Sequence, residues 1–371
     1  MRVTSGMVRQ GIINNMNSAL ARLQLSQTQI ATGKRVFKPS DDPASISRSI
    51  NIRALLADTE QFKRNIEDGL GWLEHSEAAV DDMSDIVTEL KEIAIKGASD
   101  TIDAQERTAL GEQVEMLIQR LADSANTRYG QRYVFAGSYT LTKPYSKSPE
   151  VSGEAFAVGT TGWTELANPK LVSASVVVRG PLGEVRTEGV DYEVDYALGR
   201  IRRLAGGGMV AGASYSVDYS AETTARVVLN VPDTAGEVNR EVAQGVRQPV
   251  NVGGEEILSS SVDAFSLLVR VKNALFRNDG GTVNQALDDI DAALDQVSAG
   301  LGKIGATSKS IDLASARLES EAVNLKGLIS SLEDANLAEV AVKLQGEQYA
   351  YEAALAAASN ILNTSLINFL K

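Results

Sequence analysis

Apolar side chains recur at alternating intervals of three and four residues over both ends of the chain, which is typical of helices that pack on partner helices. The first such seam consists of Ile13, Met16, Leu20, Leu23, Gln27 and Ile30. Gly33 follows it as a helix stop, and Asp42-Pro43 then offers a helix cap with a proline in the first turn. An unbroken seam from there predicts one helix over 43–98, about 84 Å long. A third helix fits 103–127.

The C-terminal third has the same pattern. One seam runs from Val283 to Leu332, and after a short break the pattern restarts over 337–362. An apolar stripe on an isolated helix would stay exposed to water, so we expect the two long seams to pack on each other, antiparallel. The predicted fold is therefore mainly α, an antiparallel coiled-coil rod formed by the N- and C-terminal segments.

The middle of the chain has a different period. Polar and apolar residues alternate over 190–196, and a turn at 197–199 then leads the chain into a further strand at Ile201. The alternation returns over 215–219, and 176–178 and 227–229 are further strand candidates. Six of the eight prolines lie between Pro144 and Pro249. We therefore expect an antiparallel β domain inserted in the rod. The predicted domains are terminal helices over 1–35 and 335–371, a helical rod over 36–140 and 255–334, and the insert over 141–254.

Composition excludes several classes of function. The formal net charge is −12, whereas a nucleic-acid binder needs a basic surface. The chain has no Cys and one His, His75, so no two-His or Cys-based metal site can form. We predict no catalytic, cofactor or metal site. Asp41 and Asp42 are interpreted as a loop and a helix cap, His75 as a helix-surface residue, and Gly206–Gly208 as a turn.

Two segments bear on targeting. The first 30 residues contain no long apolar run, so no secretory signal peptide is predicted. Residues 353–370 carry no charge, but they include several Asn, Ser and Thr side chains. Uncompensated amides are costly in lipid, so we predict no membrane span and instead a helix buried against other subunits.

Five segments carry a resemblance to flagellin-like axial proteins of the bacterial flagellum. They are Thr32–Ala44 (TGKRVFKPSDDPA), Asn65–Leu73 (NIEDGLGWL), Ala125–Gly137 (ANTRYGQRYVFAG), Ser331–Glu339 (SLEDANLAE) and Ser365–Leu370 (SLINFL). The third and fifth segments resemble the family of hook-filament junction proteins, the third hook-associated protein, more than a filament flagellin. Asn336 departs from the family, which usually has Asp there, so the capping of that loop is expected to differ.

The resemblance implies a structural protein, without enzyme activity, that forms a ring of identical copies between hook and filament. It implies hook-associated protein 1 and filament flagellin as neighbours. It also implies export to the extracellular flagellum, without a cleaved signal peptide, by the flagellar type III export apparatus and its chaperone. The family's terminal segments are disordered in the monomer and form helical tubes on assembly.

The terminal seams and this resemblance together predict where subunits meet. The predicted subunit interface consists of Ile13, Met16, Leu20, Leu23, Leu344, Leu355, Leu362 and Phe369. The spoke loop, expected to lie between the layers of the tube, includes Lys34, Arg35, Pro39, Asp41, Asp42 and Pro43. Two alternatives stay open: a filament flagellin, and an axial protein whose β insert is an adhesive or glycan-binding module.

Overall fold

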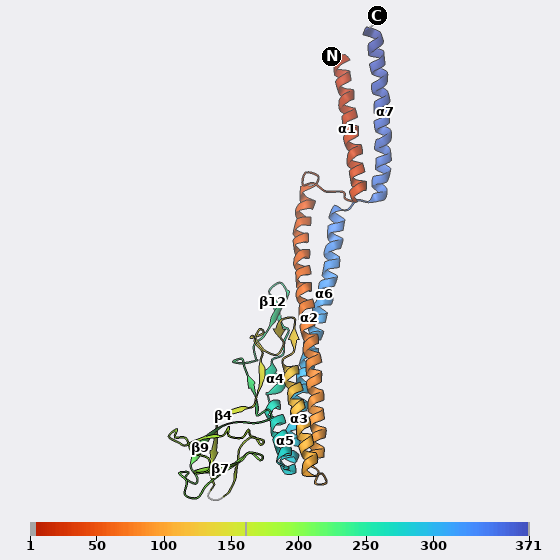
Figure 1. The fold of residues 1–371 in the computed structure, drawn as a ribbon. Helices are drawn as coiled ribbons and strands as arrows, with labels where there is room; N and C mark the ends of the chain where they lie inside the picture. The colour runs from red at the N-terminus through yellow and green to blue at the C-terminus, as the bar shows by residue number, and fades with distance from the viewer. Residues whose placement is uncertain (1–4, 160–161, 370–371) are drawn as a thin grey trace. The chain divides into compact units, whose positions relative to one another are not determined.

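The computed structural model describes residues 5–159 and 162–369. The chain divides into two compact units. We call Met1–Lys63 with Ala316–Lys371 the terminal unit, and Arg64–Ser315 the central unit. The helices are α1 (Ser5–Thr32), α2 (Pro43–Ala98), α3 (Ala104–Ala125), α4 (Gly254–Leu258), α5 (Ala264–Phe276), α6 (Gly280–Glu333) and α7 (Leu337–Phe369) (Figure 1).

The long helices begin and end where local chemistry predicts. Gly33 has a φ of +71°, a conformation that glycine adopts at little cost, and its N–H donates to the Gln29 carbonyl at the end of α1. Pro43 is the first residue of α2, as predicted. The Asp103 carboxylate accepts from the Glu106 N–H and caps α3. The helices α4 and α5 were not predicted.

The predicted antiparallel pairing of α2 with α6 is confirmed in each unit by contacts whose residue numbers run in opposite directions. In the central unit, Lys91 pairs with Asp291 at 2.6 Å, and a Cβ on Gly97 would lie 3.6 Å from Val283. In the terminal unit, Lys326 lies 3.7 Å from Glu60. Leu55 is the exception in the predicted seam, because it is 53% exposed while Leu56 is half-buried. An α-helix has about 3.6 residues per turn, so a strict seven-residue repeat rotates slowly around its surface. The contact therefore shifts by one residue, from Leu55 to Leu56.

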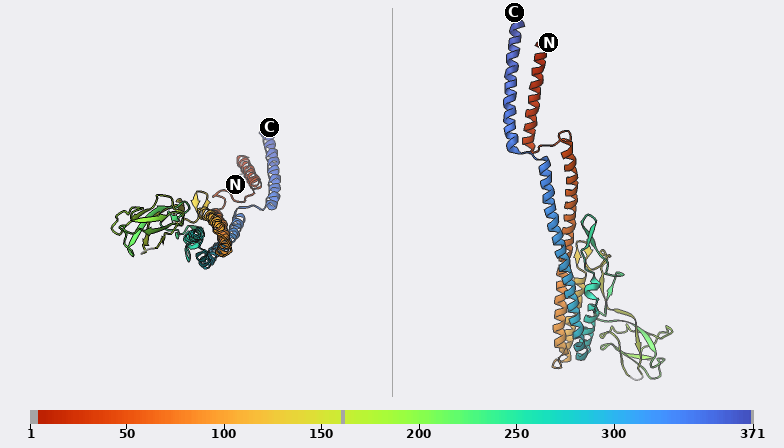
Figure 2. Two further views of the ribbon diagram at one scale, coloured as in Figure 1. Left: turned by 60° about the horizontal axis from the view of Figure 1, so that its bottom comes forward. Right: turned by 180° about the vertical axis from the view of Figure 1, so that it is seen from behind.

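The central unit adds a second buried stripe to α2, consisting of Trp72, Ala79, Ile86 and Ile93. It arises because α2 also meets α3, where Arg120 pairs with Asp82 and Glu89. Helix α5 packs on α3 in turn. Figure 2 shows these helices side by side, with the strands on one side of them.

The strands form several small antiparallel sheets. They are β1 (Arg128–Tyr129), β2 (Arg132–Tyr133), β3 (Tyr145–Ser148), β4 (Glu150–Ala157), β5 (Thr164–Glu165), β6 (Val177–Arg179), β7 (Tyr192–Asp195), β8 (Arg200–Arg203), β9 (Ser214–Ser220), β10 (Arg226–Leu229), β11 (Asn239–Ala243) and β12 (Val246–Pro249). Two three-stranded sheets, β4-β9-β6 and β5-β8-β7, share one apolar core. We call residues 150–225, which contain these sheets, the insert module.

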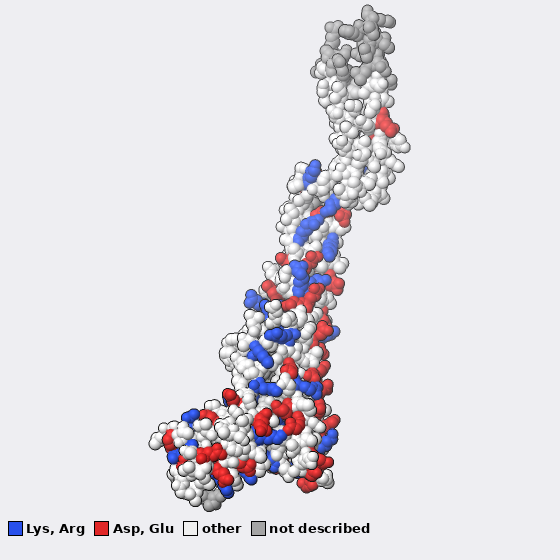
Figure 3. Space-filling model, viewed as in Figure 1, with Lys and Arg blue, Asp and Glu red and all other residues white. Residues whose placement is uncertain are grey.

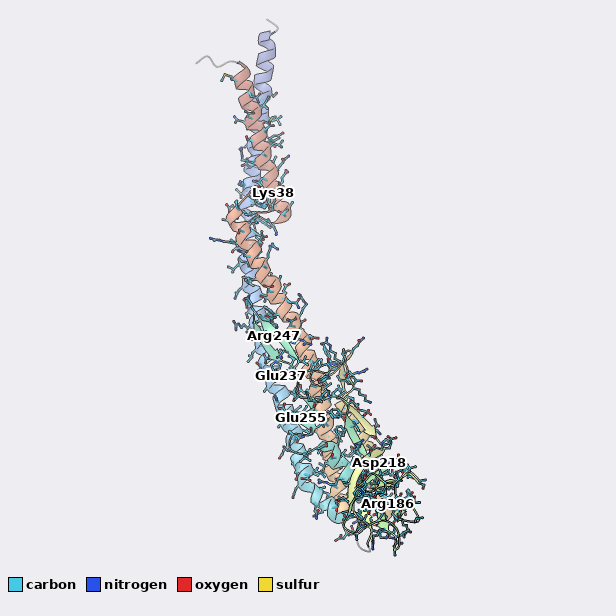
Figure 4. The ribbon with its side chains drawn as sticks, turned by 90° about the vertical axis from the view of Figure 1, so that its left-hand side faces the viewer. Lys38, Arg186, Asp218, Glu237, Arg247 and Glu255 are labelled. Carbon is cyan, nitrogen blue, oxygen red and sulfur yellow. The ribbon has the colours of Figure 1, made fainter. Side chains whose placement is uncertain are left out.

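The sequence predicted β6 to β10 but not β1 to β5, β11 or β12. In β4 the register shifts between Val151 and Glu154 beside Gly153, so the strand shows no clean alternation. The remaining strands lie outside the module: β1 pairs with β2, β3 with β10, and β11 with β12. In Figure 4, Arg186 and Asp218 mark the module, Glu237 and Arg247 the β11–β12 region, and Glu255 the start of α4.

Candidate functional site

The terminal helices α1 and α7 pack against each other in the terminal unit. Arg22 of α1 pairs with Glu347 of α7 at 2.9 Å. The face of α1 that becomes buried centres on Ala19, Ser26 and Gln29. Of the predicted interface residues, Met16, Leu20 and Leu23 are half-buried beside this face, whereas Ile13 remains 42% exposed. The contact inside the chain therefore uses only part of the apolar surface of α1.

Helix α7 shows the same division. Val340, Leu344, Glu347, Tyr351 and Ala354 recur at intervals of three and four, and all are buried or half-buried. The predicted interface residue Leu355 is 47% exposed instead. Leu362 and Phe369 belong to α7, but their side chains lie outside those that the structure describes. Other exposed apolar side chains of the two helices are Met7, Leu25, Ile30, Leu337, Val342 and Tyr349.

These two helices carry few charges. The charged residues of α1 are Arg9 and Arg22, and those of α7 are Glu339, Lys343, Glu347 and Glu352. Figure 3 shows the consequence, since the described surface of this pair is almost entirely white on the visible face, whereas the central unit is covered with both signs of charge. Exposed aliphatic side chains on a surface with little charge are candidates for contact with other protein surfaces.

The spoke loop (residues 34–43) has a defined conformation. The Asp41 carboxylate accepts from the Lys38 N–H at 3.0 Å and closes a turn, near the position that Figure 4 labels for Lys38. The Asp42 carboxylate accepts from the Ser45 N–H at 3.1 Å and its hydroxyl at 2.6 Å, which lowers the pKa of Asp42. The prediction of a loop and a helix cap is confirmed. Pro39 and Pro43 are exposed.

Glu333, the last residue of α6, holds the spoke loop in place. Its main-chain carbonyl accepts from the Arg35 N–H at 2.6 Å, and its carboxylate accepts from the Lys34 ammonium at 2.8 Å. Arg53 of α2 donates two bonds to the same carboxylate, at 2.7 and 3.1 Å, and the Ser49 hydroxyl donates another. Hydrogen bonds from Arg53 above all hold the pKa of Glu333 at about 2, although burial alone would raise it.

The sequence reasoning missed Glu333, Ser49 and Arg53 as members of this site. Ser49 lies three residues before Ile52, so it extends the α2 seam backwards by one step. The antiparallel register that pairs Glu60 with Lys326 brings this end of α2 to the end of α6. The sequence therefore does contain a signal for this site, namely polar residues at the positions where the apolar seams of α2 and α6 end.

The loop after α6 also ties the terminal helices together. The Ala335 N–H donates to the Gly33 carbonyl at 2.8 Å, and the Arg35 guanidinium donates to the Leu332 carbonyl at 2.9 Å. Asn336 caps α7, since its side-chain oxygen accepts from the Ala338 N–H at 3.2 Å. Asn is as good a cap as Asp, so the departure at Asn336 leaves the cap intact and removes only a charge.

The candidate His75 lies on a helix surface, as predicted. His75 is exposed on α2, with Nδ1 2.8 Å from the Gly71 carbonyl oxygen and its ring edge-on to Tyr129. Within residues 5–159 and 162–369, no cluster of three or more potential metal-ligating side chains occurs. In that same part of the chain, none of the helices combines the length and apolar character that crossing a membrane requires.

Comparison with known proteins identifies the family. The model of the bacterial flagellin N-terminal helical region matches residues 3–140, and that of the C-terminal helical region matches residues 287–370. Together these ranges cover more than half of the chain, and the chain belongs to the bacterial flagellin family. The matches end where the insert begins and resume inside α6.

Individual relatives are distant. Flagellin B of Helicobacter pylori strain J99 is 22% identical over 262 residues, covering 67% of this chain and 49% of the relative. Flagellar hook-associated protein 3 of Escherichia coli K12 is 26% identical over 148 residues, covering 40% of this chain and 47% of the relative. This chain thus spans about half the length of these curated relatives.

One solved structure supports the fold. A protein of Vibrio parahaemolyticus assigned as a flagellar hook-associated protein superposes with a TM-score of 0.53 at 16% identity. The match covers 79% of this chain and 100% of that one. The predicted fold class, long terminal helices around an inserted antiparallel β region, is confirmed.

Proposed function

We propose that this chain is a structural subunit of the bacterial flagellum, without enzyme activity, that forms the ring joining hook to filament outside the cell. Membership of the flagellin family supports the flagellar role, and similarity to hook-associated protein 3 of Escherichia coli supports the junction. The observation that carries the proposal is that α1 and α7 pack on each other and still leave aliphatic side chains exposed. Ile13 and Leu355 are the clearest examples, at 42% and 47% exposure.

The mechanism is the burial of these faces between copies. Each Å² of apolar surface removed from water contributes about 25 cal/mol, and a ring repeats the contact at every subunit. Met16, Leu20, Leu23 and Leu344 are half-buried within the chain and would become fully buried on assembly. Leu362 and Phe369 would extend the same interface. The spoke loop, fixed by Glu333, would set the spacing between layers of the tube.

The partners follow from this role. They are further copies of this chain, hook-associated protein 1 on one side of the ring and filament flagellin on the other. The flagellar type III export apparatus and its chaperone would deliver the chain unfolded, without cleavage of a signal peptide. Domains would then act separately, with 1–35 and 335–371 disordered in the monomer and ordered by assembly.

Electron microscopy of a strain that lacks this chain tests the proposal. We expect hooks without filaments, with filament subunits released into the medium. Gold-labelled antibody against the chain in the wild type should mark one narrow band at the end of the hook. Label along the whole filament would identify a filament flagellin instead, and normal filaments in the deletion strain would refute both roles.

A further inference from the structure

The insert module contacts the helices of the central unit through a buried lysine. Lys272 of α5 is fully buried, with 0% exposure, yet it carries an ammonium group. An ammonium has three N–H donors, and here all three find acceptors. Nζ lies 3.3 Å from the Glu115 carboxylate of α3 and 3.1 Å from the Thr223 hydroxyl, and it donates to the Thr224 carbonyl.

Glu115 completes the contact from the other side. Its carboxylate accepts from the Thr224 N–H at 3.2 Å and from the Thr224 hydroxyl at 2.5 Å. Both main-chain polar groups of Thr224 are thus bound by charged side chains of two different helices. Charge-assisted hydrogen bonds are strong and directional, so they constrain the rotation of this segment as well as its distance from the helices.

A second lysine reaches in the opposite direction. Lys170 of the module pairs with Glu112 of α3 at 2.5 Å, and its ammonium lies 3.7 Å from the centre of the Phe276 ring of α5. Lys170 has a φ of +52°, which is uncommon for a residue with a Cβ. One lysine from α5 and one lysine from the module therefore bind across the same interface.

Two more residues of α5 add polar contacts to the same interface. The Asn273 amide donates to the Ala167 carbonyl and the Asn168 side-chain oxygen, both at 2.9 Å. The Arg277 guanidinium donates to the carbonyls of Leu166 and Leu198. Asn273 and Asn168 are 4% and 3% exposed, so these bonds form away from water.

We propose that the insert module is a rigid arm of the central unit, and that Lys272 is the positioning residue that fixes its orientation on α3 and α5. A flexibly tethered module would need few buried polar contacts with the body. Apolar burial is not directional, whereas a buried polar network specifies one arrangement of the groups it joins. This inference concerns only the central unit and does not depend on where the chain assembles.

A distance measurement between spin labels tests the proposal. The chain has no Cys, so cysteines introduced at Val210 of the module and Ile95 of α2 would be its only labelling sites. Both residues are exposed, at 64% and 55%. Electron–electron dipolar spectroscopy should give one narrow distance distribution in the otherwise unchanged chain. In the Lys272→Met variant we expect the distribution to broaden roughly twofold, because the directional contacts are lost.

The control is Lys303→Met, since Lys303 pairs on the surface with Glu256, which lies in α4 outside the module. Its distribution should match that of the parent chain. If Lys272→Met fails to fold, the double variant Lys272→Met/Glu115→Leu decides, because an apolar pair can replace a buried ion pair at little cost in stability. A broad distribution in the parent, or a narrow one in the folded Lys272 variants, would overturn the proposal.

Discussion

Glu333 shows how a single carboxylate connects three segments of the terminal unit. Burial to 8% exposure disfavours its charge, but Arg53, Lys34 and Ser49 all donate to it. The donors prevail, and the pKa falls from 4.5 to about 2. Because Arg53 and Lys34 are half-exposed, water screens part of this attraction and the net stabilisation is smaller than the shift suggests.

Replacing Glu333 with Gln should loosen the spoke loop at neutral pH. We expect a loss of about 1–2 kcal/mol, because hydrogen bonds to a charged group contribute about 1.5–3 kcal/mol and the exposure of Arg53 and Lys34 reduces this. The amides of Arg35 and Val36 donate to the Glu333 carbonyl, so their hydrogen-exchange protection should fall by roughly 5- to 30-fold. Glu60→Gln is the control, since Glu60 is exposed and its partner Lys326 lies 3.7 Å away. Equal protection in both variants would show that the carboxylate does not hold the loop.

The same site predicts a pH dependence with a definite sign. A carboxylate whose pKa is lower in the folded chain stabilises it above the unfolded pKa, near 4.5, and loses that effect as pH falls toward about 2. The protection of Arg35 and Val36 in the parent chain should therefore decline between pH 4.5 and 2. In Glu333→Gln this component of the decline should be absent.

At the scale of elements, the sequence predicts the long helices well and the insert only in part. The seams of α2 and α6 are strong signals because their apolar residues face a single antiparallel partner helix over many turns. Helix α5 was missed because Lys272 occupies its buried face, where a heptad pattern requires an apolar residue. Its burial depends on Glu115 and Thr224, which are distant in sequence, and no local pattern contains that information.

The terminal helices show a second limit of prediction from sequence. Their seams predict helices, but not which apolar residues contact α7 within the chain and which remain exposed. Ile13 and Ile30 belong to the predicted seam and are exposed, while Ser26 and Gln29 are buried. The hydrogen bond between Ala335 and Gly33 in the adjoining loops fixes the register of α1 on α7, and the register determines which residues are buried.

Substituting Leu355 with Asp should separate assembly from monomer stability. Leu355 is 47% exposed in the single chain, so the substitution should change the melting temperature by only a few degrees at most. Between subunits the carboxylate would be buried without a partner, which costs several kcal/mol in every copy. We expect exported protein, bare hooks and released filament subunits.

Tyr351→Asp provides the contrast, because Tyr351 is half-buried within the chain on the face of α7 that packs on α1. It should weaken the packing of α7 on α1 that assembly brings about, measured as faster amide exchange in α1 of the assembled protein. If Leu355→Asp cells carry normal filaments, the outer face of α7 is not a subunit interface. A large fall in its melting temperature would place Leu355 in the monomer core instead.

At the scale of the whole molecule, charge is distributed unevenly. The terminal helices balance Arg9, Arg22 and Lys343 against Glu339, Glu347 and Glu352, so the net charge of −12 belongs to the rest of the chain. Like charge keeps single chains soluble and opposes non-specific association. The terminal helices, whose charges cancel, can then associate without working against that repulsion.

The insert module can be removed where the strands that lead into it and out of it pair with each other. Ser148 at the end of β3 pairs with Arg226 at the start of β10, so a two-residue turn can join them. A larger cut over 141–249, which takes out nearly all of the predicted insert (141–254), would also remove groups that cover the helices. Tyr145 is 6% exposed against Phe265, and Arg240 pairs with Asp68 at 2.7 Å.

Replacing residues 149–225 with Asn-Gly should therefore give a folded chain that still supports filaments. The module's apolar core leaves as a whole, and the Lys272–Glu115 pair becomes exposed to water rather than buried without partners. The 141–249 deletion should instead destabilise the central unit by about 3 kcal/mol or more, since it removes a large buried aromatic side chain. Thermal unfolding of the two purified proteins and electron microscopy of the two complemented strains provide the comparison. If the short deletion is exported and folded but leaves bare hooks, the module itself takes part in the junction. If both deletions behave alike, β3 and the β11–β12 hairpin do not support the helices as these contacts indicate.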